Sequence, residues 1–240
     1  MFDFRLGSFI FVCFCICATS AASAQSIVQD VVIDNQFPTG EPLEKAIDYF
    51  TGKDFPSVVV GNARGGVYLY RSIGGTLKGP WKRSIINAGG SAYERARSVH
   101  FKGERYPDLI ASLSNQIVWL QNPLNRAEGR DPTIPWSELV INPEHGCHNI
   151  RLVDLDGDSN VDVVCSAAIS LRGPQFVAFQ DDPKHWSVIY DIADVGDDIA
   201  VVRIRGSDLP HLVGADHNGT VSWYENPRLT GGGARIGLSI

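Results

Sequence analysis

Cysteine is scarce in this 240-residue chain: of five, Cys13, Cys15 and Cys17 lie in an apolar N-terminal run, which leaves Cys147 and Cys165. Two cysteines are too few for a disulfide-built miniature fold. Basic residues are not in excess either, because 21 Lys and Arg against 27 Asp and Glu give a net charge of −6. This balance argues against a nucleic-acid partner. We find no Ser-His-Asp order, phosphate-binding glycine loop or paired-thiol redox motif.

The N-terminus has the features of a secretory signal. A short start with one basic residue, Arg5, precedes the apolar run 6–18, and Ala22-Ser23-Ala24 matches a small-x-small cleavage pattern. The run is shorter than the roughly 20 residues that a membrane helix needs. We therefore predict a signal peptide over residues 1–24 and a secreted or periplasmic protein without membrane insertion after cleavage. The alternative is a retained membrane anchor.

The two remaining cysteines flank an acidic loop on strands that we expect to pair as a hairpin. Folding this hairpin about its loop places Cys165 opposite Arg151, which is four residues from Cys147. At about 3.3 Å per residue, this separation exceeds the reach of a disulfide. We therefore expect two unpaired, buried thiols.

A module of about fifty residues recurs four times. Four segments align on Gly52, Gly103, Gly157 and Gly206, which are 51, 54 and 49 residues apart. A period of this length indicates a repeat architecture, in which each unit buries its apolar face against its neighbours. Such scaffolds bind partners more often than they catalyse reactions.

Each repeat contains four short segments rich in β-branched and aliphatic residues, separated by turn signals and lacking helical periodicity. The pattern predicts an all-β fold, a β-propeller of about four four-stranded blades over residues 25–228, followed by a flexible tail at 229–240. The fourth repeat lacks a fourth strand, which residues 27–34 could supply by closing the ring. The alternative is a truncated larger propeller. The expected strands are 43–50, 57–61, 66–70 and 81–86; 95–101, 108–112, 116–120 and 136–141; 147–155, 162–167, 175–179 and 186–192; and 198–204, 211–215 and 220–224.

Repeat three carries an acidic loop with the spacing of a calcium site. Oxygens from alternate residues of a tight loop converge on one hard cation, and Ca²⁺ accepts six to eight of them. The other repeats lack this set, so we predict one Ca²⁺ of structural role; the alternative is a metal-free acidic turn. The predicted ligands are Asp154, Asp156, Asp158, Asn160, through its backbone carbonyl, and Asp162.

The loop and the strand ends together resemble the FG-GAP/VCBS repeat family. The resemblance rests on Asp154-Leu-Asp156-Gly-Asp158 and on the segments Trp119-Leu-Gln-Asn-Pro123 and Trp223-Tyr-Glu-Asn-Pro227. Ser159 departs from it, because the family usually has a second glycine there. The resemblance implies an integrin-like β-propeller, commonly secreted. Many such proteins bind ligands or carbohydrates, and a few relatives process sugars.

A second candidate site lies where the first strand of each repeat approaches the propeller axis. Polar residues at matching heights would face one another there and could hydrogen-bond a sugar; the alternative is a rim satisfied by water. We expect a non-catalytic binding module for an extracellular carbohydrate or protein. The alternative is a sugar-processing lyase or dehydratase, with His148 as base and Arg97 or Arg151 stabilising an enolate-like charge. The predicted ligand-binding residues are Glu94, Arg95, His148, Asn149, Asp197 and Asp198.

Overall fold

The computed structural model describes residues 31–38, 40, 42–52, 54–89, 93–113, 115–126, 131–166, 175–182, 184–190, 198–215 and 219–226. The predicted signal peptide at 1–24, the predicted tail at 229–240, Asp197 and the side chain of Glu94 lie outside this description. Within it, the chain is all-β apart from one 3₁₀ turn, η1 (Pro123–Asn125).

Four antiparallel sheets follow one another along the chain, one for each predicted repeat, and within each sheet consecutive strands pair in sequence order. The described part of sheet four has three strands, as the sequence predicts. Sheet one contains β1 (Pro42–Asp48), β2 (Ser57–Asn62), β3 (Val67–Ser72) and β4 (Trp81–Asn87); sheet two contains β5 (Tyr93–Val99), β6 (Asp108–Leu113), β7 (Gln116–Gln121) and β8 (Ser137–Asn142); sheet three contains β9 (Asn149–Val153), β10 (Asp162–Ser166), β11 (Phe176–Asp182) and β12 (His185–Tyr190); and sheet four contains β13 (Asp198–Val202), β14 (His211–Ala215) and β15 (Val221–Tyr224).

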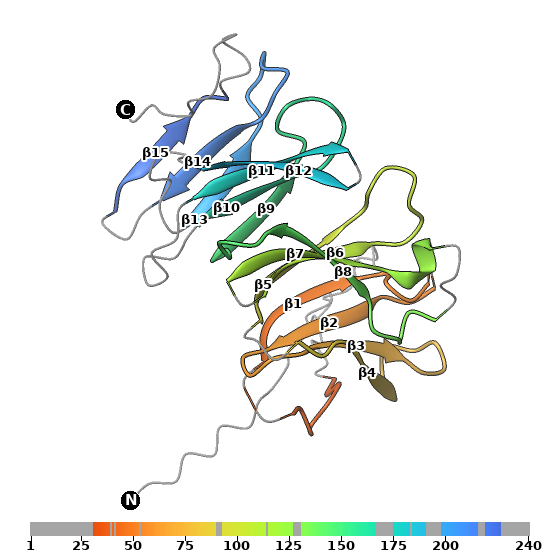
Figure 1. Cartoon of the computed structure of the whole chain (residues 1–240). Helices are drawn as coiled ribbons and strands as arrows, with labels where there is room; N and C mark the ends of the chain where they lie inside the picture. The colour runs from red at the N-terminus through yellow and green to blue at the C-terminus, as the bar shows by residue number, and fades with distance from the viewer. Residues whose placement is uncertain are drawn as a thin grey trace, which may run out of the picture.

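The sheets stack face against face in a row, with sheet one at one end and sheet four at the other (Figure 1). The first strands of successive sheets contact one another, β1 with β5, β5 with β9 and β9 with β13. We call these four first strands, β1, β5, β9 and β13, the inner strands of the row. The described residues do not close the row into a ring.

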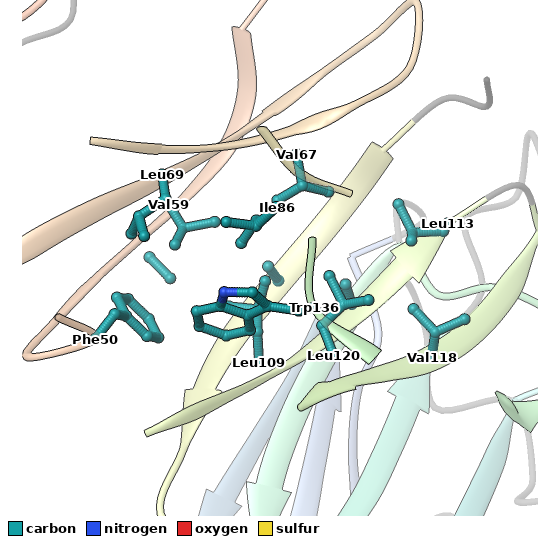
Figure 2. Close-up of a cluster of buried hydrophobic side chains, with 13 residues drawn as sticks. Phe50, Val59, Val67, Leu69, Ile86, Leu109, Leu113, Val118, Leu120 and Trp136 are labelled. Atoms are coloured by element: carbon teal, nitrogen blue, oxygen red, sulfur yellow. The ribbon is translucent and has the colours of Figure 1, made fainter. Parts of the chain in front are cut away.

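Apolar side chains between the sheets form the core. Between sheets one and two, Val59 and Leu69 face Leu109, and the indole of Trp136 lies among them next to Phe50, with ring centroids 5.9 Å apart (Figure 2). Fully burying one valine, leucine or phenylalanine side chain contributes about 1.5–3 kcal/mol to the stability of the fold. Strands β2, β6 and β10 are buried along their whole length because both of their faces pack against apolar side chains. This explains their continuous aliphatic runs.

Two asparagines connect neighbouring sheets through their side chains. Asn122 Nδ2 donates to Phe50 O of sheet one at 2.9 Å and to Pro107 O at 3.0 Å. Asn226 donates in the same way to Leu155 O of sheet three at 2.6 Å and to Pro210 O. Both asparagines are buried and precede a proline after the third strand of their sheets. The recurring Asn-Pro pair thus satisfies buried carbonyls across the sheet boundary.

The segment before β1 lies against the outer face of sheet one. Asp34 accepts hydrogen bonds from Tyr70 Oη at 2.9 Å and from Arg83 Nη1 at 2.7 Å. Ile33 and Phe37 pack on the apolar cluster of that face. Residues 31–34 therefore do not supply a fourth strand to sheet four, because their contacts hold them at the opposite end of the row.

The structure contradicts the expectation of two free thiols. Cys147 and Cys165 form a disulfide with Cα atoms 5.3 Å apart, and both residues are fully buried. The expected pairing assumed a strand that ran straight from Cys147, but β9 begins only at Asn149, and Cys165 pairs with Ile150. The chain bends at His148, whose N–H donates to Ser166 O at 2.8 Å. This bend brings Cys147 alongside Cys165.

Removing the disulfide is expected to lower the free energy of unfolding. The bond closes a loop of 18 residues, for which the chain-entropy relation gives about 3 kcal/mol. We expect urea unfolding of Cys147→Ala/Cys165→Ala to show this loss against the oxidised parent protein, with the reduced parent as a matched control. An unchanged midpoint in both comparisons would contradict the assignment.

Candidate binding and metal sites

A row of polar side chains crosses the inner strands of all four sheets. Glu44 of β1 lies 3.7 Å from Arg95 Nε and 3.6 Å from Arg97 Nη1, both on β5. Arg95 Nη2 lies 3.3 Å from His148 Nε2. In the next part of the row, Arg151 of β9 pairs with Asp198 of β13 at 3.1 Å, and Asn149 hydrogen-bonds both of them. We call these seven residues the inner row.

The inner row is accessible to solvent. The side chains of Arg95, Arg97 and Arg151 are 31, 36 and 31% exposed, and that of Asp198 is 67% exposed. His148 Nδ1 is buried and makes no hydrogen bond to any described residue. The guanidinium groups are therefore held in place by neighbours and are partly exposed to solvent.

Four of the predicted ligand-binding residues, Arg95, His148, Asn149 and Asp198, lie in this row. The two arginines of the alternative catalytic assignment, Arg97 and Arg151, belong to it as well.

A set of close contacts fixes the chain immediately before His148. Asn115, in the β6–β7 turn with φ of 64°, donates to Glu144 O at 3.0 Å and accepts from Gly146 N. Cys147 N donates to Ser112 Oγ at 3.0 Å. A Cβ on Gly146 would lie 2.6 Å from Ser112 Oγ, so only glycine allows this approach. His148 therefore projects from a backbone anchored to sheet two and, through the disulfide, to β10.

The acidic loop of repeat three gathers three carboxylates. Oxygens of Asp154, Asp156 and Asp162 lie within 4.8 Å of one another. Asp162 is fully buried and accepts from Leu155 N at 2.8 Å and Gln180 N at 3.1 Å. The two remaining predicted ligands, Asp158 and Asn160, hydrogen-bond each other through their side chains at 2.7 Å.

The loop has marked electrostatic and backbone features. Burial, with the negative charges of Asp156 and Asp158, raises the pKa of Asp162 to about 7. Ser159 has φ of 71°, in the region that glycine favours. Close carboxylates of this kind repel one another until a cation or a proton neutralises them.

In repeat two, an arginine side chain lies beside the carboxylates of the loop that corresponds to the acidic loop of repeat three. Glu104 and Asp108 occupy the positions of Asp158 and Asp162 in the repeat alignment. Arg126 lies 3.3 Å from Glu104 Oε1 and 3.6 Å from Asp108 Oδ2. Buried Asp108 also accepts from Trp119 Nε1 at 2.6 Å. No sequence pattern indicated this role of Arg126, because Arg126 lies beyond η1, far from the loop in the chain.

Repeats one and four fill the same buried position with hydrogen-bonding side chains that are not carboxylates. Ser57 Oγ lies 2.8 Å from Thr51 Oγ1, and His211 Nε2 lies 3.0 Å from Ser207 Oγ. Of the four equivalent loops, only that of repeat three gathers three or more potential metal-ligating side chains among the described residues.

No family model matches the chain, and no curated protein does. The part of the chain that the structure describes contains no helix long and apolar enough to cross a membrane. The buried disulfide is consistent with an oxidising compartment.

We expect the carboxyl group of Glu104 to make the free energy of unfolding depend on pH. Burial, together with the nearby charge of Asp108, raises the pKa of Glu104 to about 7 from an ordinary 4.5. The folded state holds this proton more tightly than the unfolded state, so the stability it contributes is full below pH 4.5 and lost as the pH rises to about 7. We expect Glu104→Gln to flatten the fall in unfolding free energy between pH 5 and 7, measured by urea unfolding in chelator.

The matched control is Glu225→Gln, since Glu225 is an exposed carboxylate. It should keep the parent slope. A parent-like slope in Glu104→Gln would show that Glu104 does not carry the effect.

Proposed function

We propose that this chain is a secreted β-propeller of the FG-GAP/VCBS type that serves as a non-catalytic binding module for an extracellular carbohydrate or protein. The observation that supports this most is the inner row, which carries polar side chains from four successive repeats on one solvent-accessible surface. The four stacked sheets would be the blades, either of a small ring or of part of a larger one.

The inner row suits recognition of a hydroxyl-rich ligand. It offers guanidinium donors, an amide and carboxylate acceptors over the width of several strands, so an extended glycan could contact several repeats at once. The backbone before His148 is anchored by Ser112 and Asn115, so one of the contact residues is already ordered. Such preorganisation lowers the entropic cost of binding.

A sugar-processing lyase or dehydratase is the second candidate. The observation that favours it is His148, whose Nδ1 makes no hydrogen bond to a described residue and whose Nε2 lies 3.3 Å from Arg95. An imidazole beside a guanidinium can abstract a proton while the positive charge stabilises the enolate-like product.

Glycan-array binding followed by product analysis distinguishes these two functions. For the binding module, we expect retention of a glycan without turnover, and roughly tenfold weaker binding by His148→Ala, because one hydrogen-bonding contact is worth about 0.5–1.5 kcal/mol. Turnover that disappears in His148→Ala while binding persists would establish the enzyme instead. Asp208→Ala, at an exposed site, is the control that should change neither result.

We also propose that the acidic loop binds one structural Ca²⁺ through Asp154, Asp156 and Asp162, with Asp158 and Asn160 completing the set. The comparison within the chain supports this. In repeat two, the guanidinium of Arg126 stands beside the equivalent carboxylates, whereas in repeat three no basic side chain of the described residues forms an ion pair with Asp154 or Asp162. A bound cation would supply the positive charge that Arg126 supplies in repeat two.

Calcium should stabilise the protein through this loop. Extracellular modules commonly bind calcium at about 10⁻⁴–10⁻³ M, so calcium at about 1 mM should add about 0.4–1.4 kcal/mol to the unfolding free energy. We expect the melting temperature to rise with calcium in the parent protein and in the control Asp208→Ala, but not in Asp156→Ala. Equal destabilisation of Asp156→Ala with calcium and with chelator would exclude the site.

A further inference from the structure

Arg97 and Arg151 occupy equivalent places in repeats two and three. Across the strand ladders, Arg97 pairs with Ile110 and Arg151 pairs with Val164. Ile110 lies two residues after the buried Asp108, and Val164 lies two residues after the buried Asp162. Each guanidinium also donates to the carbonyl of the preceding residue, at 2.7 Å for Arg97 and 3.3 Å for Arg151. The two side chains therefore begin from the same backbone arrangement, and their surroundings can be compared directly.

Their acidic partners differ. Arg151 is paired with Asp198, the first residue of the inner strand of the following sheet, at 3.1 Å. The residue at the place of Asp198 on β9, the inner strand that follows Arg97, is Asn149. This side chain is neutral and already hydrogen-bonds Arg151 and Asp198. Among the described residues, the boundary between sheets two and three therefore has no carboxylate at the place that Asp198 occupies at the next boundary.

Glu44 is a more distant partner for Arg97 than Asp198 is for Arg151. It approaches from sheet one and lies 3.6 Å from Arg97 and 3.7 Å from Arg95. Asp198 lies 3.1 Å from Arg151 and accepts a hydrogen bond from its guanidinium. Apart from Ala96 O and Glu44, Arg97 makes no hydrogen bond or ion pair with a described residue, and its side chain is 36% exposed.

We infer that Arg97 binds the carboxylate or sulfate of an acidic glycan. This acidic group would lie beside Arg97 in the same way as Asp198 lies beside Arg151. A guanidinium presents its donors in a fork that matches such groups, and charge-assisted hydrogen bonds are about twice as strong as neutral ones. The inference rests on the proposed binding function and names its ligand class. It also assigns to Arg97 a specificity role that Arg151 lacks, because Arg151 is already paired.

Calorimetric titration with oligogalacturonate and its carboxyl-reduced counterpart tests this assignment, because the two probes differ only in the acidic group. We expect the acidic probe to bind at least tenfold more tightly, with an affinity that falls as salt rises. Arg97→Gln should lower that affinity about ten- to a hundredfold. Arg97→Lys, which keeps the charge without the fork, should lie between. Arg205→Gln, at an exposed site, should match the parent protein.

The outcomes separate this inference from the proposed function. Equal affinity for the two probes, or an Arg97→Gln variant that binds oligogalacturonate like the parent, would overturn the acidic-glycan assignment and leave the binding module in place. Arg97-dependent binding of poly-glutamate in preference to oligogalacturonate would replace the glycan with an acidic peptide. If neither probe and no array glycan or peptide binds, both proposals fail.

Discussion

Burial of apolar sheet faces against the next sheet is the interaction on which this structure depends. Each sheet has three or four described strands, and a repeat unit of this kind cannot bury its apolar faces by itself. Stacking buries these faces between neighbouring sheets. The apolar clusters around Trp136, Trp119 and Leu155 fill the three successive boundaries. The buried amides of Asn122 and Asn226 add directional bonds, which fix how one sheet sits on its neighbour.

The polar features follow from this stacking. Because the sheets meet along their first strands, side chains at one height of β1, β5, β9 and β13 come together although they are about fifty residues apart in the chain. The inner row is therefore a product of the repeat. Its differences between boundaries, such as Asn149 where the next strand has Asp198, are where specificity can arise. The same holds at the loops, where Arg126 lies beside carboxylates in one repeat and acidic residues cluster in another.

Much of this could be predicted from the sequence, because the deciding signals are local and periodic. The glycine spacing and the aliphatic runs predicted the number of sheets and nearly all strand positions, and the repeat alignment set Asn149 and Asp198, whose side chains hydrogen-bond, at one height. The disulfide was missed because a single bend at His148 changes the partner of Cys147, and strand periodicity does not report such bends. The role of Arg126 was missed because it depends on a long-range contact after η1.

The disulfide also changes what a single backbone cut would do to this protein. Cys147 and Cys165 enclose β9, the acidic loop and β10, so every exposed turn of that hairpin lies within one covalently closed ring. A protease that cleaves at Asp158 or Ser159 would leave two chains joined by the sulfur bridge, each still paired along the ladder between β9 and β10. The halves of the molecule would remain associated after cleavage, a property suited to an environment rich in secreted proteases.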